Sequence, residues 1–460
     1  MDCQVRQRHR LQHGLRALRA ELVAGANAKT LRSVPSSGPV SVRQTLPERH
    51  ELSAEPRLVS ERPRRRLSPA LGIFLWSRAA IWIGALFALL VFEPNRNPDA
   101  ARFDAPFLHD LGYFTDIWAR SDSKFYVGIA EHGYRFAIGA PAFPPLYPGA
   151  IRVLGKALFG HYVLAGMLIS LAACLGAFML LYRIAEERLG AEGARRTVVY
   201  LAVFPMSVFL QAVYTESLFL LLVLGAFFLA DRGQWLGAWT STGLAALTRS
   251  AGFALVPALA LLAWRSPDRR RALAGLPLVP ALFSIFPLVL WRETDHPWSF
   301  LHAHRYWSQH VSPFGPLAGI WAGIHDGVTG LWRLLSHGPA VRTSIASGPD
   351  FETWKAAFDV QALLFLVVFA VLTVIAWRRF GSVYGLFAAL SLAFPLSTPA
   401  TASTSIALQS LPRYVMAIFP CFLALAWIGR QPGRHTVIVA VSSVLLGLSV
   451  VQWALWQWVA

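Results

Sequence analysis

Long runs of apolar residues set the fold class of this chain. The first run, Ala70–Phe92, would reach about 34 Å as a helix that rises about 1.5 Å per residue, which is enough to cross a bilayer core. Further apolar runs follow at 162–183, 197–213, 214–230, 235–249, 250–264, 273–291, 360–377, 382–396, 413–428 and 436–458. The pattern predicts an all-α polytopic membrane protein with about eleven transmembrane helices.

The charge content excludes a soluble fold. Hydrophobic residues make up 55% of the chain and charged residues only 15%, whereas about a quarter of the residues of a soluble domain are charged. The formal net charge of +17 rests mostly on arginines that gather before residue 70 and between the apolar runs. Nucleic acid is not an expected partner, because no basic stripe accompanies a soluble domain. Contact of these arginines with anionic membrane lipids accounts for the charge better.

The first 68 residues differ from the rest of the chain. They are polar and rich in Arg, Pro, Ser and Glu, and they hold too little apolar surface to fold alone. No apolar segment follows the first charges, so a cleavable signal peptide is not expected. The sequence predicts a disordered basic cytoplasmic tail over 1–68 and a polytopic membrane domain over 69–460. Cys3, Cys174 and Cys421 form neither a disulfide framework nor a CxxC metal motif.

Arginine placement also predicts the orientation of the chain. The cluster Arg62–Arg66 precedes the first run, so the positive-inside rule puts the N-terminus in the cytoplasm. Counted from there, every predicted cytoplasmic loop contains arginine. We therefore expect a multi-pass plasma-membrane protein with a large extracytoplasmic first loop, 93–160, and a second extracytoplasmic segment, 292–359.

Two parts of the chain depart from simple spans. The run Pro316–Leu335 is compatible with an amphipathic helix on the outer surface or with a re-entrant piece. The runs between 197 and 264 are short and are broken by Pro205, Gly233 and Gly252. Broken helices at membrane depth are tolerated where they line a cavity or are buried in protein. The middle of the chain is therefore predicted to build a pocket that opens outward.

Asp122 is the main candidate for chemistry in the first loop. It lies among aromatic residues at a predicted membrane surface, where a carboxylate can act as a general base toward a hydroxyl group. The alternative is a structural one. Asp122 stands at the start of a predicted helix over 123–131, where an aspartate commonly caps the free backbone N–H groups.

Three further ionisable residues lie at the predicted outer ends of apolar runs. Glu216 follows the turn that begins at Gln211, Arg249 joins two short runs, and Arg413 opens the penultimate span. Charged groups near a membrane are costly unless they are paired or hydrated, which makes them functional candidates. Mutual neutralisation of Glu216 and Arg249, and snorkelling of Arg413 to the interface, are the alternatives.

A histidine-containing segment follows in the second extracytoplasmic stretch. His296, His302 and His304 lie close together, but the spacing of the last two does not put both on one helical face. Neither HExxH nor DxD accompanies them. The sequence predicts neither a metal site nor a cofactor, and the tryptophans nearby are typical of an interfacial aromatic belt.

A series of short motifs spans roughly residues 70–430. In chain order they are Asp122–Tyr126, Gly133-Tyr134, Phe143–Pro148, Tyr214–Leu218, Thr248–Gly252, His296–Phe300 and Arg413-Tyr414 with Phe419-Pro420. In this order the series resembles the PIG-V family of GPI mannosyltransferase 2-like membrane glycosyltransferases, which have the GT-C fold.

The resemblance implies an inverting glycosyltransferase with segment 93–160 as its catalytic loop. It would move a sugar, which the resemblance implies is mannose, from a polyprenyl-phosphate donor to a hydroxyl of a lipid-linked or exported glycan. Asp122 would be the base, while Arg249 and Arg413 would stabilise the departing phosphate. The expected substrate-binding residues are Arg120, Lys124, Tyr126, Tyr147, Glu216, Arg249, His296, Arg413 and Tyr414.

One departure from the family pattern concerns the residue before Asp122. Family members commonly carry Arg-Trp-Asp, whereas this chain has Arg120-Ser121-Asp122. The departure leaves open a non-catalytic homologue that scaffolds a membrane complex. A lipid or small-molecule transporter or flippase is the other alternative, although such proteins usually show internal repeats and charged sites near the midplane.

Overall fold

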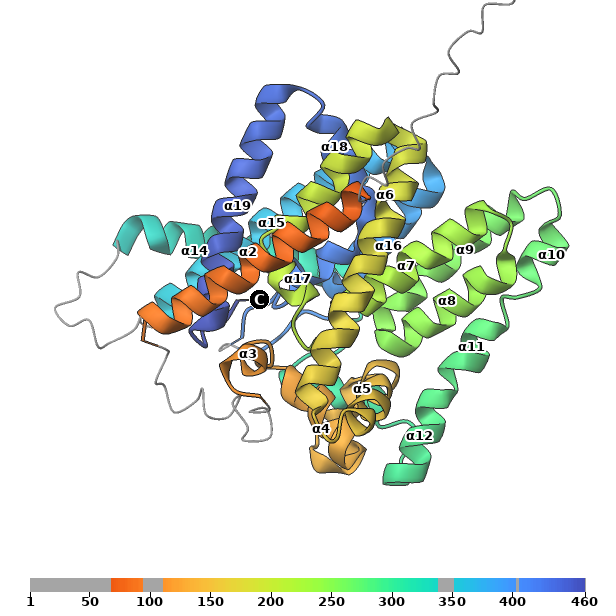
Figure 1. Cartoon of the computed structure of the whole chain (residues 1–460), viewed down its shortest axis with the longest axis horizontal. Coiled ribbons are helices and arrows are strands. Elements are labelled where there is room, and N and C mark those ends of the chain that lie inside the picture. Colours follow the sequence, from red (N-terminus) through yellow and green to blue (C-terminus); the bar gives the residue numbers. More distant parts are fainter. Residues whose placement is uncertain (1–67, 94–110, 338–350, 403–404, 460) are drawn as a thin grey trace, which may run out of the picture. The chain divides into compact units, whose positions relative to one another are not determined.

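The computed structural model describes residues 68–93, 111–337, 351–402 and 405–459. These residues belong to one compact unit, Arg65–Ala460. Its regular structure is helical apart from an isolated bridge between Gln309 and Ala400 in the described ranges. The longest helices are α2 (Pro69–Val91), α6 (Tyr162–Ala202), α14 (Pro316–His337), α15 (Phe351–Phe380) and α19 (Pro432–Ala454) (Figure 1).

Shorter helices complete the unit. Those before α7 are α3 (Tyr113–Asp116), α4 (Ser123–His132), η3 (Tyr134–Phe136), η4 (Ala140–Ala142), α5 (Leu146–Ala157) and η5 (Ser207–Leu210). The middle holds α7 (Glu216–Asp231), α8 (Trp235–Thr248), η6 (Ser250–Ala254), α9 (Leu255–Trp264), α10 (Arg269–Leu273), α11 (Leu278–Phe283) and α12 (Ile285–Thr294). Later come α13 (Phe300–Ala303), η7 (His304–Trp307), α16 (Ser382–Leu396), α17 (Leu411–Tyr414), η8 (Val415–Ala417) and α18 (Phe419–Ile428).

The chain is a multi-pass helical membrane protein. Five helical segments of the described residues are long and apolar enough to cross a bilayer, namely 69–91, 162–202, 269–294, 352–380 and 432–454. A sixth candidate, 411–428, is bent by 83° between its two halves. Large apolar side chains on these helices face outward, among them Ile83 and Leu90 at 68% and 77% exposed. Such exposure is expected where lipid replaces water as the solvent.

The predicted count of about eleven spans is not reproduced by these helices. The run 197–213 is not one span, because α6 continues to Ala202 and the next residues form turns and η5. Pro205 lies just beyond the helix end, as expected for a residue that cannot donate a backbone hydrogen bond. Gly190, with φ 71° and ψ 173°, lies at a kink that divides α6 into two helical parts. Helices α7, α8 and α9 have 16, 14 and 10 residues and are too short for ordinary spans.

Helix α6 is the element around which the site is built. It packs against α2, α5, α7 and α18, and α19 packs against α2 (Figure 1). Glycines permit the closest approaches near the site. A Cβ at Gly166 would meet Val213 at 2.5 Å, and one at Gly252 would meet the backbone of Ala246 at 2.4 Å. Gly166 therefore lets the connection after α6 lie against the start of that helix, and Gly252 lets η6 fold back onto α8.

The run at 316–335 forms a continuous helix, α14. Apolar side chains stand out along one side, with Trp321 and Leu335 at 71% and 74% exposed. On the other side, a Cβ at Gly319 would meet the backbone oxygen of Leu396 at 2.3 Å. The helix is therefore continuous and amphipathic, and its position on the outer surface stays a prediction. The predicted disordered tail, 1–68, lies outside the described residues except for Ser68.

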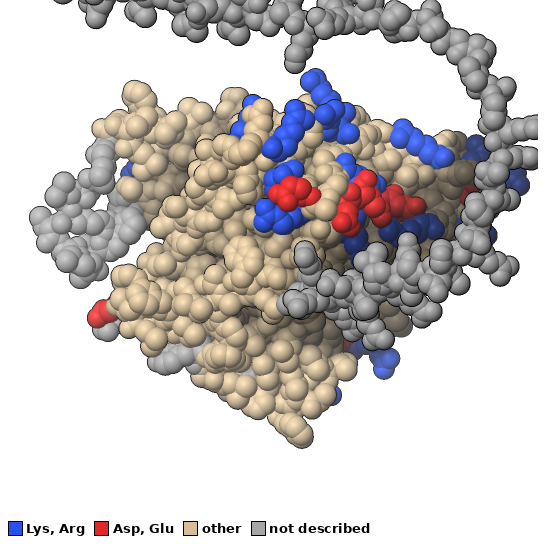
Figure 2. Space-filling view, turned by 45° about the horizontal axis from the view of Figure 1, so that its top comes forward, with Lys and Arg blue, Asp and Glu red and all other residues tan. Residues whose placement is uncertain are grey.

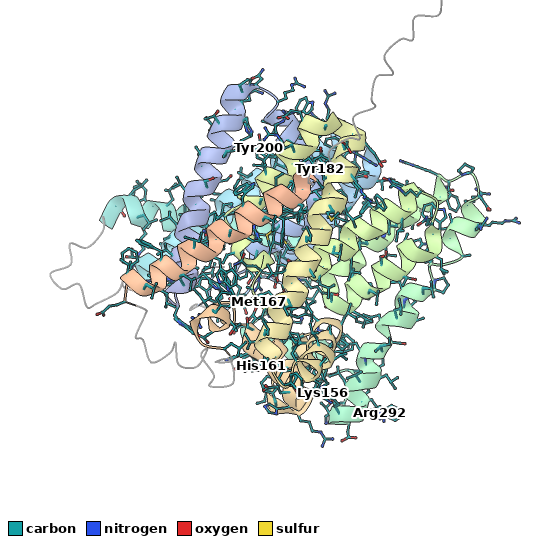
Figure 3. The ribbon with its side chains drawn as sticks, in the orientation of Figure 1. Lys156, His161, Met167, Tyr182, Tyr200 and Arg292 are labelled. Carbon is teal, nitrogen blue, oxygen red and sulfur yellow. The ribbon has the colours of Figure 1, made fainter. Side chains whose placement is uncertain are left out.

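Charge is unevenly spread over the surface. In the face drawn in Figure 2, Lys, Arg, Asp and Glu side chains gather in a band, and a broad area next to it is almost free of charge. Figure 3 labels Tyr182 and Tyr200 toward one end of α6 and His161 and Met167 toward the other. The candidate site described next lies at the His161 end, where Gly166 and Ser170 contact the segment before α7.

Candidate active site

A cavity of about 940 Å³ opens among α4, η6, the start of α7, the end of α16 and the segment 407–417. One part of its wall carries charged side chains and the rest is largely aromatic and aliphatic. The charged lining residues are Asp122, Lys124, Glu216, Arg249 and Arg413. Apolar lining residues include Phe143, Phe219, Phe253, Phe283, Phe300, Val311, Phe394 and Leu408. A cavity of this size, apolar with a few convergent polar groups, is typical of a small-molecule or lipid site.

Four of the charged residues form a continuous chain of ion pairs, called here the cavity ion chain: Asp122, Arg413, Glu216 and Arg249. An Nη1 of Arg413 donates to Oδ2 of Asp122 at 2.9 Å, and its Nε lies 3.2 Å from Oε1 of Glu216. Arg249 donates to the same Oε1 at 2.5 Å. Glu216 therefore pairs with Arg413 as well as with Arg249, and not with Arg249 alone as the sequence suggested.

Local backbone structure aims Asp122 into the cavity. Asp122 stands at the N-cap position of α4, but its side chain makes no capping hydrogen bond. Ser121 before it adopts a left-handed conformation with φ 50°, which is costly for a residue with a Cβ. The Asp122 backbone N–H donates to the hydroxyl of Tyr214 at 3.1 Å, and that hydroxyl donates to the carbonyl of Arg120 at 3.2 Å. The carboxylate is left to contact Arg413, so the capping alternative does not hold.

Glu216 is presented by the first turn of α7. Its side chain is only 4% exposed, and Oε2 has no hydrogen-bond partner among the described residues. A carboxylate at a helix N-terminus is stabilised by the helix dipole. The Asp122 side chain is 27% exposed. Asp122 is therefore the carboxylate of the pair that a ligand in the cavity can reach, whereas Glu216 is placed to hold the two arginines.

Arg413 lies on the short helix α17, whose first turn contains Pro412. Ser410 precedes that helix in a left-handed conformation with φ 67°, and its hydroxyl accepts from Nη2 of Arg413 at 3.3 Å. The guanidinium thus contacts Asp122, Glu216 and Ser410 with three different nitrogens. A planar guanidinium with donors in fixed directions suits this task, whereas the point charge of a lysine does not. The predicted snorkelling of Arg413 is not observed, since its side chain is 7% exposed.

Aromatic rings surround the two arginines. The Arg249 guanidinium lies 4.5 Å from the centre of the Tyr414 ring, and that of Arg413 lies 5.1 Å from the Tyr214 ring. Tyr126 on α4 lines the cavity and its hydroxyl lies 3.4 Å from Oγ1 of Thr215. Burial and the nearby Glu216 carboxylate raise the pKa of Tyr126, so that its hydroxyl stays protonated and can donate.

Lys124 reaches the cavity from the first turn of α4. Burial lowers the pKa of its ammonium group, and the neighbouring Asp122 carboxylate opposes that shift. The formal charges within the cavity ion chain cancel, two carboxylates against two guanidiniums. Lys124 therefore brings the positive excess among the charged residues of the cavity wall.

Three of the predicted binding residues have other surroundings. Arg120 is 3% exposed, pairs with Asp116 at 3.2 Å and lies 3.4 Å from the ring of Trp456. Tyr147 is fully buried, with its hydroxyl 2.7 Å from Oγ of Ser170. His296 is exposed and does not line the cavity. None of the three lines the cavity, and their expected contacts with substrate stay predictions.

Sequence reasoning missed several residues of the site. The left-handed backbone of Ser121 and Ser410 was not predicted, because only glycine makes such a conformation visible from residue type. Thr215 accepts from Arg249 at 3.3 Å, and Gln409 lines the cavity. The one available signal was position, since Thr215 and Ser410 each precede a helix whose first turn carries a charged candidate.

His304 also lines the cavity. His302 is exposed and is not part of the wall. Within the described ranges, no group of three or more His, Cys, Asp or Glu side chains is placed to hold a metal ion.

Comparison with known proteins gives a family match over part of the chain. Residues 105–262 match the family model described as Mannosyltransferase (PIG-V). A search of curated protein sequences finds no match. Solved structures similar to this one include ArnT from Cupriavidus metallidurans bound to undecaprenyl phosphate, with 17% identity, a TM-score of 0.37 and 78% of each chain covered.

Another similar structure is the Archaeoglobus fulgidus oligosaccharyltransferase in complex with Zn and sulfate. It is 12% identical, with a TM-score of 0.36, and the similarity covers 67% of this chain and 44% of that one. With TM-scores below 0.5, neither structure carries an argument about this site. The family match does, and it includes Asp122, Glu216 and Arg249. It confirms the resemblance seen in the sequence: residues 105–262 of this chain match the family of PIG-V mannosyltransferases.

Proposed function

We propose that the cavity is the transfer site of a membrane enzyme that moves mannose from a polyprenyl-phosphate donor to a hydroxyl of a lipid-linked or exported glycan. The observation that carries the proposal is the cavity ion chain at the charged end of an otherwise apolar cavity. A lipid-phosphate donor needs an apolar wall for its isoprenoid tail, cationic groups for its phosphate and a carboxylate for the acceptor hydroxyl. The cavity wall supplies all three.

Asp122 acts as the general base in this mechanism. Its carboxylate pairs with Arg413 at 2.9 Å and is still open to the cavity. The acceptor oxygen attacks C1 of the mannose while the bond from C1 to the donor phosphate oxygen breaks, so that the configuration at C1 is inverted. The hydroxyl proton passes to the Asp122 carboxylate, and the electron pair of the broken bond leaves with the phosphate.

Lys124, Arg249 and Arg413 stabilise the phosphate that leaves. Arg249 and Arg413 both pair with the single carboxylate of Glu216, and each guanidinium has further N–H donors. An incoming phosphate can accept hydrogen bonds from these donors without breaking the pairs with Glu216. Lys124 adds the charge that the ion chain itself lacks. Tyr126 and Tyr414 shape the space beside the reacting centre.

The proposed orientation follows the arginine distribution. The N-terminus and the tail 1–68 are cytoplasmic, the domain 69–460 crosses the plasma membrane, and 93–160 and 292–359 are extracytoplasmic. About eleven crossings of a GT-C-like fold would include short helices such as α7, α8 and α16 as partial or tilted spans. This arrangement puts the transfer site on the outer face, where a lipid-linked donor would be flipped to meet it.

The test is Asp122→Asn, assayed for transfer of mannose from polyprenyl-phosphate mannose to membrane lipids. We expect transfer to fall by about 10²–10⁴-fold, the usual contribution of a positioned general base. Asp295→Asn is the matched control, since it makes the same chemical change at a side chain that is 79% exposed. A folded Asp122→Asn protein with the wild-type rate would remove Asp122 as the base. Wild-type protein that binds the donor but never turns it over would favour the scaffold alternative.

A further inference from the structure

The connection between α6 and α7, residues 203–215, is a buried irregular segment that delivers two residues to the site. Its side chains are almost completely enclosed, for example Val208, Leu210 and Val213 at 0% exposed. A backbone that lacks the regular hydrogen bonds of a helix must find other partners when it is buried. The segment ends at Thr215 and Glu216, which contact Arg249.

The second half of this connection is fastened to the site by side-chain hydrogen bonds. Ser123 donates to the carbonyl of Val213 at 3.1 Å, and Ser170 donates to that of Tyr214 at 3.2 Å. Ser217 donates to the carbonyl of Leu210 at 2.5 Å. These contacts fix residues 210–214 against α4, α6 and α7. They leave open what fixes the first half of the connection.

Arg78 of helix α2 fastens that first half. Its Nη1 donates to the carbonyl of Ser207 at 2.8 Å, and its Nη2 donates to the hydroxyl of Ser207 at 2.7 Å and to the carbonyl of Ala202 at 3.3 Å. Its Nε donates to the hydroxyl of Ser77 at 3.3 Å. The residue is 5% exposed, and no carboxylate pairs with it among the described residues.

A buried guanidinium without a carboxylate is an expensive feature of a membrane helix. Its compensation here is geometric. Ala202 is the last residue of α6, where carbonyl groups lack partners within the helix and the dipole is negative. A cation at that end is favoured and also satisfies carbonyls that an irregular buried segment would leave without partners. A smaller polar residue could not reach Ala202 and both acceptors of Ser207 at once.

We propose that Arg78 is a positioning residue for the transfer reaction: by holding the start of the 203–215 connection, it sets where Glu216 stands and thereby how Glu216 holds Arg249 and Arg413. The proposal rests on the proposed function of the cavity. It extends that function to a residue that does not line the cavity and is contributed by the first transmembrane helix.

The first test compares Arg78→Met with Arg78→Lys in the full-length protein. We expect Arg78→Met to lower kcat by about 10–100-fold with little change in donor KM, since small misplacement of catalytic groups has effects of this size. Arg78→Lys should recover part of the rate, because an ammonium can still donate to Ser207. Arg188→Met is the control, since it removes an arginine that is 23% exposed and whose partner, Asp231, lies beyond the connection.

The second measurement does not depend on transfer. Hydrogen–deuterium exchange of the backbone amides in 203–215 should be faster in Arg78→Met than in wild type, while exchange within α19 stays unchanged. Normal exchange in the connection, or a fall in kcat no larger than that of Arg188→Met at equal folded content, overturns the proposal. If wild-type protein transfers no mannose, the proposed function fails, and the exchange experiment still decides whether Arg78 holds the connection.

Discussion

Two ion-paired groups of this protein have the same composition and different surroundings. The cavity ion chain joins two arginines and two carboxylates whose side chains are between 4% and 27% exposed. A second group, called here the surface ion chain, lies just before the kink of α6 and at the end of α7; it joins Arg188, Arg232, Glu187 and Asp231. Its pairs lie at 2.6, 2.7 and 3.7 Å, and its side chains are between 20% and 44% exposed.

The comparison shows that burial decides how much such ion pairs contribute to stability. Exposed pairs contribute about 0–1 kcal/mol because water screens them. Breaking a buried pair by removal of one partner costs about 3–5 kcal/mol because the other charge stays behind without compensation. The surface ion chain also uses a glycine, Gly233 with φ 70°, where its turn needs a left-handed residue, whereas the cavity uses Ser121 and Ser410. Tolerated backbone strain of this kind gathers at functional sites.

The largest expected difference between the two ion chains is in stability and transfer rate when the carboxylate that pairs with two arginines, Glu216 or Glu187, is neutralised. Glu216→Gln leaves two buried guanidiniums without their common partner, so we expect loss of about 3–5 kcal/mol of stability and at least about 100-fold slower transfer. Glu187→Gln makes the same change in the surface ion chain and should leave both nearly unchanged. Thermal unfolding in detergent and the mannose-transfer rate of folded protein are the measurements. Equal effects in the two variants would mean that burial does not distinguish the two groups.

A smaller effect concerns the positive excess of the cavity. Lys124→Met removes a charge-assisted contact with the donor phosphate and should raise donor KM by about 10–100-fold. Lys156→Met, at an exposed lysine of α5, should not. Because burial lowers the pKa of Lys124, the group loses its proton at a lower pH than an exposed lysine does. Donor KM should therefore rise as the pH increases through that lowered pKa.

Lys124→Arg separates the pH effect from the loss of the side chain. A guanidinium stays charged throughout the accessible range, so the alkaline rise of donor KM should disappear in this variant. Persistence of the same rise would assign it to another group.

The smallest expected effects come from exchanging the left-handed residues of the two chains. Ser121→Gly relieves a φ of 50° and should stabilise the protein by about 0.5–1 kcal/mol, with part of the gain cancelled by greater freedom of the unfolded chain. Gly233→Ser should destabilise by about 1–2 kcal/mol, since it puts a Cβ at φ 70°. Unfolding temperatures measure both changes. A destabilising Ser121→Gly would show that the serine hydroxyl, and not the backbone, is what the position requires.

The sequence was sufficient to predict the class of protein and the core of the site. Long apolar runs identify a polytopic helical membrane protein whatever its packing, and charges at the ends of such runs are rare enough to single out Asp122, Glu216, Arg249 and Arg413. Pairing among them follows from their cost when isolated. Pairing of Arg413 with Asp122, across 291 positions of the chain, could not be read from spacing.

Other features were beyond sequence reasoning for physical reasons. Residues 203–215 are as apolar as a membrane span because they are buried in protein, and hydropathy does not distinguish protein from lipid as the surroundings. Arg120 and Tyr147 have the residue types of binding groups, but each is satisfied by an internal partner. Arg78 was not recognised as a candidate because a single arginine does not interrupt an otherwise apolar run.

The order in which the chain is synthesised gives the cavity ion chain a further consequence. Asp122, Glu216 and Arg249 are synthesised long before Arg413, and until then Glu216 has one arginine and the Asp122 carboxylate lacks its ion-pair partner. The last helix then closes the first loop as well, since Trp453 donates to the carbonyl of Ile117 at 2.6 Å and Trp456 lies against Arg120. We therefore expect a nascent chain that stops before α17 to keep an uncompensated carboxylate and an open first loop, and so to need α17 and α19 before the site is complete.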